Sequence, residues 1–270
     1  STMPPLPPRW SLEGHRALIT GSTKGIGLAC AREFLSLGGT VFITARNAEE
    51  VAGTVATLRG EYSEAQVEGF PSDICTSEGR TALLAAVEAA WGGALDCLVN
   101  NAGTNVRKPM LEATDDEYDS IVRVNMDAVW YLCKAAHRLL VKSTRPVVVN
   151  VSSVAGVNST GSGGVYGMTK AAVVQLTKTM ACEWAKYSIR VNCIAPWVTM
   201  TPLLAEAVKN NPAALDKAAA WTPMGRPAQP EEIAAGVAFM ALPCASFVTG
   251  QTLCVDGGLM AGAFAGPCTD

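Results

Sequence analysis

The chain has 270 residues, of which 49% are apolar and 17% are charged, and its formal net charge is −3. This composition fits one compact domain with a large buried sheet and excludes a disordered chain. The small charge gives no electrostatic reason to expect nucleic acid or an anionic membrane as a partner, and no apolar run reaches the ~18 residues that a membrane span needs. We therefore expect a cytoplasmic protein. We also expect no metal site, because the two histidines do not cluster with cysteines or acids.

A proline-rich stretch opens the sequence and is followed by the pattern of a dinucleotide-binding turn. Residues 1–11 contain four prolines, which favour an extended arm over a helix or a central strand. A short apolar strand over residues 17–20 then leads into a glycine turn and a helical pattern that ends near Leu37. Glycines let the backbone approach a pyrophosphate, which binds at the positive end of the helix. The turn residues expected at the cofactor are Gly21, Thr23, Lys24, Gly25, Ile26 and Gly27.

The positions that select the cofactor carry cations. Arg46 follows the second predicted strand, about 20 residues after the glycine turn, where an acid would bind a ribose 2′-hydroxyl. Arg46 and Lys24 instead suit a 2′-phosphate, so the sequence favours NADP(H) over NAD(H). Glu49 and Glu50 are interpreted as charges at the start of a helix capped by Asn47, not as ligands of the ribose.

Strands and helices alternate along the rest of the chain, which predicts a parallel sheet covered on both faces. We expect an α/β fold, with a single Rossmann-like, doubly wound domain of about seven strands over residues 12–258 and a tail over residues 259–270. The later strands are expected at residues 40–44, 66–70, 95–99, 147–152, a sixth ending at 196, and 251–255. The later helices are expected to begin after Asn47 and to cover residues 77–91, 116–141, 165–187, 202–210 and 231–242.

Polar residues follow the fourth predicted strand and interrupt the apolar pattern of the helix after it. Asn101, Ala102 and Gly103 lie at the carboxyl edge of the sheet, where they could satisfy backbone groups or contact the cofactor. Asn125 lies among apolar residues of the long helix, and a buried amide needs a hydrogen-bond partner. We interpret Asn125 as a residue that holds a water molecule.

A serine, a tyrosine and a lysine carry the pattern of proton-transfer chemistry. Ser153 follows the fifth strand, and the next helix opens near Tyr166 with Lys170 four residues later. Positions i and i+4 share a helical face, so the ammonium can lie beside the phenol. The positive charge stabilises a phenolate, and the phenol can then exchange a proton with a substrate oxygen that Ser153 also holds. The same spacing also arises from a packed tyrosine and a solvated lysine, so this motif alone does not establish an enzyme.

Together, these motifs resemble the classical short-chain dehydrogenase/reductase family over residues 12–258. The resemblance rests on TGSTKGIG from Thr20, NNAG from Asn100, Asn125, Ser153 and Tyr166-x-x-x-Lys170, in the order of the family. Within the family the chain is most similar to the tropinone reductase-like subgroup, through NNAGTNVRKP, ACEWAKYSIRVNCIAPW, TPMGRPAQPEEIA and TGQTLCVDGG.

The resemblance implies a role for each motif residue. Tyr166 would be the general acid for reduction, and Lys170 would support it and bind the nicotinamide ribose. Ser153 would orient the carbonyl group, and Asn125 would hold a relay water. Further cofactor contacts would come from Arg46, Asp73, Ile74, Asn101, Ala102, Gly103, Pro196, Val198 and Thr199. Substrate contacts would come from Arg107, Val154, Trp197, Leu203 and Leu204, with a flap over about residues 199–223.

The sequence also departs from the family at one position. Most members carry Pro-Gly where this chain has Pro196-Trp197, a substitution that its subgroup shares. The bulky indole would either narrow the substrate pocket or anchor the core.

We therefore expect an NADPH-dependent carbonyl reductase, reversible as an alcohol dehydrogenase, that transfers hydride to a small alicyclic or apolar ketone. The alternatives are a 3-ketoacyl thioester reductase and a non-catalytic nucleotide-binding protein of the same fold. A homodimer or homotetramer is expected, because the helices over residues 116–141 and 165–187 carry apolar side chains on more than one face. Arg107 and Lys108 either face the substrate, which would disfavour protonated ketones such as tropinone, or point to solvent.

Overall fold

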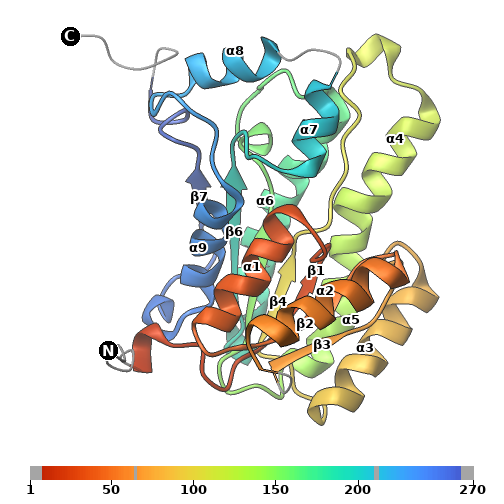
Figure 1. Cartoon of the computed structure of the whole chain (residues 1–270), viewed down its shortest axis with the longest axis vertical. Helices are drawn as coiled ribbons and strands as arrows, with labels where there is room; N and C mark the ends of the chain where they lie inside the picture. Colours follow the sequence, from red (N-terminus) through yellow and green to blue (C-terminus); the bar gives the residue numbers. More distant parts are fainter. Residues whose placement is uncertain (1–7, 64–65, 210–212, 263–270) are drawn as a thin grey trace.

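A computed structural model describes residues 8–63, 66–209 and 213–262. Its centre is one sheet of seven parallel strands in the order β3-β2-β1-β4-β5-β6-β7. Figure 1 shows the strands in the middle of the molecule, with helices around them. The strands are β1 (Arg16–Thr20), β2 (Thr40–Thr44), β3 (Val67–Gly69), β4 (Cys97–Asn100), β5 (Val147–Val151), β6 (Arg190–Pro196) and β7 (Thr252–Val255). This architecture confirms the predicted α/β, Rossmann-like fold.

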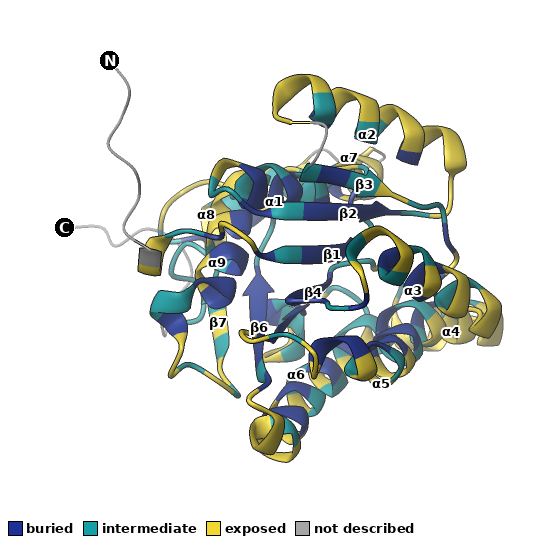
Figure 2. Ribbon diagram, turned by 90° about the horizontal axis from the view of Figure 1, so that it is seen from below, coloured by how far each residue is buried: buried dark blue, intermediate teal, exposed yellow. Residues whose placement is uncertain are grey.

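Helices pack on both faces of the sheet (Figure 2). One face is covered by α1 (Gly25–Ser36), α2 (Ala48–Glu61) and α9 (Pro230–Ala241). The other face is covered by α3 (Ser77–Trp91), α5 (Ala128–Leu140) and α6 (Gly164–Trp184). The shorter helices α4 (Asp115–Val122), α7 (Pro202–Val208) and α8 (Ala213–Trp221) complete the fold.

The strands are apolar on both sides because each side faces helices. In β1, Ala17 and Ile19 pack with α1 and α9, whereas Leu18 between them packs with α3 and α5. All three side chains are fully buried. Successive side chains of a strand point to opposite faces, so a sheet with two covered faces needs nearly continuous apolar strands.

The strand order reverses beside β1. The chain passes from β1 to β2 and β3 on one side and then returns to β4 on the other. In open parallel sheets, ligands bind at the carboxyl ends of the strands where the order reverses. Gly21 follows β1 and Asn101 follows β4, so both predicted cofactor residues lie at this point.

The long helix predicted over residues 116–141 is divided into two. It begins as α4 with a capping box between Thr114 and Glu117, and it passes through a π-helical turn, η4 (Arg123–Asp127), into α5. A π turn accommodates an extra residue and often occurs at functional sites. It contains Asn125, whose interactions are described below.

Other boundaries also differ from the prediction. Pro8–Trp10 forms one turn of 3-10 helix where an extended arm was expected, because proline is well accommodated in the first turn of a helix; residues 1–7 lie outside the described part. The third strand is only three residues long. The segment expected as a flap contains a second helix, α8, in addition to α7.

Candidate active site

Tyr166 and Lys170 share one face of the first turns of α6, as their spacing predicted. The Lys170 ammonium is buried, and its Nζ donates a hydrogen bond to the carbonyl oxygen of Val151 at 2.9 Å. The same Nζ lies 5.7 Å from the centre of the Tyr166 ring, which is within the range of a cation–π contact. The end of β5 therefore holds the ammonium beside the tyrosine.

Contacts with β5 and the following turn fix the position of α6. Ser152 Oγ donates to the carbonyl oxygen of Lys170 at 2.7 Å. A short 3-10 turn, η5 (Val154–Gly156), packs so closely on α6 that a Cβ atom at Gly156 would lie 2.5 Å from the Lys170 carbonyl carbon. Glycine permits this approach, and the tyrosine–lysine pair is thereby set against the sheet edge.

Ser153 opens the 3-10 turn η5. Its Oγ accepts the N–H of Ala155 at 3.1 Å and lies 3.5 Å from the carbonyl oxygen of Pro196, to which it can donate. These contacts join the ends of β5 and β6. The hydroxyl is partly oriented by the backbone before any substrate binds.

Asn125 is fully buried and clamps the loop that follows β4. Its Oδ1 accepts the N–H of Thr104 at 2.8 Å, and its Nδ2 donates to the carbonyl oxygen of Thr104 at 2.9 Å. Nδ2 also lies 3.4 Å from the hydroxyl of Thr169, the residue before Lys170. Because both amide protons have partners, the side chain is structural, and a relay water would have to use other groups of this residue.

Gly103 brings the clamped loop to Lys170, the lysine predicted to be catalytic. A Cβ atom at this position would lie 3.4 Å from Asn125 Oδ1 and 3.5 Å from Lys170 Nζ. The NNAG segment, the π turn and α6 therefore meet at one point. The structure brings together the elements that carry all four predicted catalytic residues.

The glycine turn after β1 is held by the NNAG segment. Asn101 Nδ2 donates to the carbonyl oxygens of Thr20 and Gly21, at 2.9 and 3.1 Å. Gly21 has φ +62°, and a Cβ atom at Gly27 would lie 2.3 Å from Gly21 O. Only glycine fits such a turn at these two positions, and it leaves the backbone at the start of α1 free of side chains. This arrangement fits the pyrophosphate of a dinucleotide.

The loop after β3 holds the residues expected near adenine. Asp73 is exposed, and its Oδ1 accepts the N–H of Cys75 at 3.0 Å. Ile74 is buried in the core, so its side chain serves packing. Burial, aided by Asp73, raises the pKa of Cys75 to about 11, so this thiol stays protonated near neutral pH.

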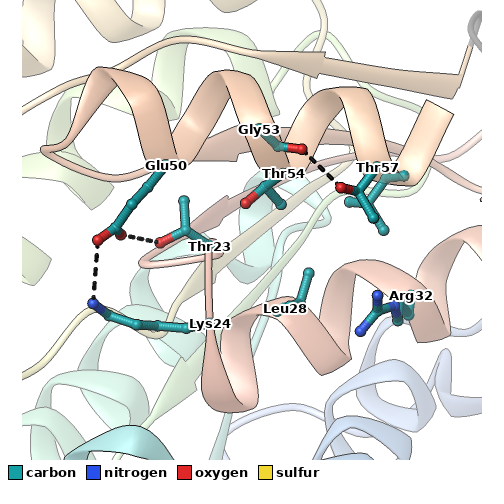
Figure 3. Close-up of a pocket in the computed structure, with 9 residues that line it drawn as sticks. Thr23, Lys24, Leu28, Arg32, Glu50, Gly53, Thr54 and Thr57 are labelled. Carbon is teal, nitrogen blue, oxygen red and sulfur yellow. Dashed lines mark hydrogen bonds and ion pairs between the residues drawn. The ribbon is translucent and has the colours of Figure 1, made fainter. Parts of the chain in front are cut away.

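A surface pocket lies between α1 and α2, and Lys24, one of the two predicted 2′-phosphate residues, lines it (Figure 3). It encloses about 310 Å³, and its lining runs from Thr23 and Lys24 to Arg32. At its rim, Lys24 Nζ lies 3.6 Å from Glu50 Oε1. Arg46 is exposed and forms no ion pair with the residues that the structure describes. None of the four predicted catalytic residues lines this pocket.

The predicted nicotinamide residues lie where β6 ends. Thr199 is buried, and its hydroxyl donates to the carbonyl oxygen of Trp197 at 3.0 Å. Val198 accepts the N–H of Ala228 at 2.9 Å through its carbonyl oxygen. The carbonyl oxygen of Pro196 lies 3.5 Å from Ser153 Oγ, so this segment contacts the turn that carries the predicted catalytic serine.

The predicted substrate residues are in different environments. Leu203 is half exposed, Leu204 is buried in the fold, and the Trp197 indole donates to Thr222 Oγ1 at 3.0 Å. Val154 is fully buried, so its side chain offers no surface to a substrate in this structure, contrary to the prediction.

The two cations after the NNAG segment, Arg107 and Lys108, are also in different environments. Arg107 is exposed, whereas Lys108 forms an ion pair with Glu117. Of the two cations that could face a substrate, Lys108 is therefore engaged by a carboxylate.

Thr20 and Glu50 contribute to the site without having been identified from the sequence. Thr20 Oγ1 accepts the N–H groups of Asn101 and Ala102, both at 3.0 Å, and so sets the distance between β1 and the NNAG segment. Its position directly before the first glycine is the signal that could have identified it. Glu50 contacts the glycine turn through its side chain, and nothing in its helix-start pattern indicates that contact.

Comparisons with known proteins identify the family of this chain. A family model described as "Enoyl-(Acyl carrier protein) reductase" matches residues 21–260. A tropinone reductase homologue of Arabidopsis thaliana, described as chloroplastic, is 42% identical over 95% of this chain and 79% of its own length. A tropinone reductase homologue of Datura stramonium is 37% identical over 95% of this chain and 96% of its own length.

Two solved structures with the same architecture contain NADP. A gluconate 5-dehydrogenase of Burkholderia cenocepacia, solved with NADP and tartrate, has a TM-score of 0.88 and 35% identity, covering 95% of this chain and 99% of that one. The RhlG–NADP complex of Pseudomonas aeruginosa has a TM-score of 0.87 and 33% identity, covering 94% and 99%. The chain therefore belongs to the short-chain dehydrogenase/reductase family, within which it is most similar to the tropinone reductase-like proteins.

Proposed function

We propose that this protein is an NADPH-dependent carbonyl reductase whose substrate is a small, neutral, alicyclic or apolar ketone, and that it also runs in reverse as an alcohol dehydrogenase. Its family and its NADP-containing structural neighbours make it an NADP-dependent oxidoreductase acting on CH–OH and C=O groups. The observation that carries the ketone assignment is the buried Lys170 ammonium held beside the Tyr166 ring.

The roles of the residues follow from this proposal. NADPH supplies the hydride. Tyr166 donates a proton to the substrate oxygen, Lys170 supports the developing phenolate, and Ser153 orients the carbonyl group. Asn125 holds the π turn and the NNAG loop together, and a backbone group of the same turn would bind the relay water.

The cofactor would lie along the sheet edge. Lys24 and Arg46 would bind its 2′-phosphate, the glycine turn its pyrophosphate, and Asp73 its adenine. Asn101 and Gly103 would lie along the cofactor, and Val198 and Thr199 would contact its nicotinamide carboxamide.

The experiment that tests the function is a panel of ketones and alcohols followed by NADPH absorbance. The panel contains small bicyclic and monocyclic ketones, a charged amino ketone and a 3-ketoacyl thioester. We expect the neutral ketones to give the highest kcat/KM. A thioester as the best substrate would favour the second candidate, a ketoacyl reductase, to which the acyl carrier protein in the description of the matching family model also points.

We further propose a homodimer or homotetramer. Trp130 and Tyr131 on α5 and Met168 on α6 are each about half exposed, and large apolar side chains on adjacent helices commonly mark an interface. Light scattering at micromolar concentration should show a mass of at least twice that of the 28.2 kDa chain. A purely monomeric species would contradict this part of the proposal.

The cytoplasm is the location that we propose. No described helix is long and apolar enough to cross a membrane. Because a relative is described as chloroplastic, expression of a fluorescent fusion of the full natural protein is the appropriate test. Signal confined to plastids would overturn the location without affecting the proposed chemistry.

A further inference from the structure

Glu50 connects α2 to the glycine turn. Its Oε2 accepts the hydroxyl of Thr23 at 3.1 Å, and its Oε1 lies 3.6 Å from Lys24 Nζ (Figure 3). The backbone fixes where this carboxylate lies, because Asn47 Oδ1 accepts the N–H groups of Glu49 and Glu50 and starts α2 directly after β2. Glu50 is a charge at a helix start, as its sequence pattern indicates, but its side chain is directed to Lys24, one of the two residues predicted to bind the 2′-phosphate.

We infer that Glu50 is a competing anion that limits the affinity of this protein for NADPH. In the free protein, Lys24 pairs with Glu50; on binding, Lys24 exchanges this carboxylate for the 2′-phosphate. Breaking the Lys24–Glu50 ion pair costs little free energy, because the two side chains are 63% and 44% exposed and exposed ion pairs are weak. After the exchange, the carboxylate remains close to the phosphate and repels it. This inference rests on the assignment of Lys24 in the proposed function.

Arg46 is unaffected by this competition. It is exposed and has no ion-pair partner among the residues described, so its charge stays available to the phosphate. Glu50 therefore weakens one of two cationic contacts and leaves the other intact. NADH carries an uncharged hydroxyl at the same position, so Glu50 does not repel it. The consequence is that Glu50 reduces the preference for NADPH over NADH.

Direct binding to Glu50→Gln tests the inference without a substrate. Isothermal titration at low ionic strength should give a Kd for NADPH about three- to tenfold lower than in the unmodified protein, because one negative charge beside the phosphate is gone. The Kd for NADH should change by less than about twofold, and added salt should reduce the gain for NADPH. Glu49→Gln is the matched control, since it removes the same charge from the same helical turn, and Glu49 forms no ion pair with the described residues.

Two results would overturn the inference. Weaker NADPH binding by Glu50→Gln would mean that the carboxylate positions Lys24 for the phosphate, and equal gains from Glu49→Gln and Glu50→Gln would mean that only net charge matters. Lys24→Ala separates this question from the proposed function. If Lys24→Ala binds NADPH as tightly as the unmodified protein, the assignment of Lys24 to the 2′-phosphate is wrong. If it binds NADPH more weakly and Glu50→Gln brings no gain, only the role of Glu50 is wrong.

Discussion

Trp197 donates its indole N–H to Thr222 Oγ1 at 3.0 Å, and Thr222 in turn donates its hydroxyl proton to the carbonyl oxygen of Ala218 at 2.8 Å. Trp197 follows β6 and Thr222 follows α8, so this bond joins the two ends of the segment proposed as a flap. Thr222 is 1% exposed, and a buried donor or acceptor without a partner is costly. Of the two roles considered for Trp197, the structure supports that of an anchor.

Removing the indole N–H should loosen this segment. Trp197→Phe keeps an aromatic ring but leaves Thr222 Oγ1 without its hydrogen-bond donor. Loss of such a hydrogen bond costs about 1 kcal/mol, so the population of molecules in which this segment is detached should rise roughly fivefold. Trypsin cleavage after Lys209, which directly follows α7, should become faster to the same extent. Thr222→Val should also increase the cleavage rate. Thr222→Ser retains the hydroxyl and should leave the cleavage rate unchanged. Equal cleavage rates for the valine and serine variants would contradict the anchoring role.

Tyr166→Phe should abolish ketone reduction and leave NADPH binding nearly unchanged. The substitution removes only the proton donor, and the loss of a general acid lowers kcat by roughly 10²- to 10⁴-fold. NADPH absorbance measures turnover, and fluorescence titration measures binding. Tyr187→Phe, at an exposed tyrosine just after α6, is the control and should behave as the unmodified protein. Turnover by a folded Tyr166→Phe at the original rate would reject the assigned chemistry.

The sequence predicted the parallel sheet, the glycine turn and the pairing of Tyr166 with Lys170, because each depends on local patterns. Apolar strands, a strand–glycine–helix transition and an i, i+4 pair are visible within a few residues. The π turn at Asn125 was missed, because the helical periodicity continues through it and the side chain finds its partners in a distant loop. The Trp197–Thr222 and Glu50–Lys24 contacts were missed for the same reason: each joins residues about 25 positions apart in the chain.

Burial of His15 should make the protein less stable in acid. His15 is 1% exposed, and neither ring nitrogen has a hydrogen-bond partner in the described structure. Burial, reinforced by Arg145, lowers its pKa from 6.5 to about 4. Protonation therefore favours the unfolded state, so this contribution to stability is complete above pH 6.5 and is lost as the pH falls toward 4.

Replacing His15 with leucine should remove this dependence. The free energy of unfolding, measured by urea denaturation from pH 7.5 to 4.5, should fall less steeply in His15→Leu than in the unmodified protein, by up to about 3 kcal/mol over the range. At pH 7.5 the variant should be at least as stable, because it no longer buries two unpaired nitrogens. Parallel curves for the two proteins would show that another group controls acid stability.

Arg107 should discriminate against positively charged ketones. Two contacts hold its loop near the site: Thr104 is bound to Asn125 in the π turn, and Asn105 Nδ2 donates to the carbonyl oxygen of Ser162, two residues before α6, at 3.0 Å. Lys108 is neutralised by Glu117, so Arg107 is the remaining cation of the pair. Two like charges a few ångströms apart repel by several kcal/mol at an effective dielectric of about 20, and exposure to water and salt reduces this considerably.

We therefore expect a neutral bicyclic ketone to be a better substrate than tropinone, which is protonated near neutral pH. Arg107→Gln should raise kcat/KM for tropinone by about three- to tenfold, which is the value for a repulsion of roughly 1 kcal/mol, and should leave the neutral ketone unchanged. Arg107→Lys keeps the charge and should resemble the unmodified protein, so it separates charge from side-chain shape. If tropinone is clearly the better substrate and Arg107→Gln does not alter its kcat/KM, Arg107 points to solvent and takes no part in selecting the ketone.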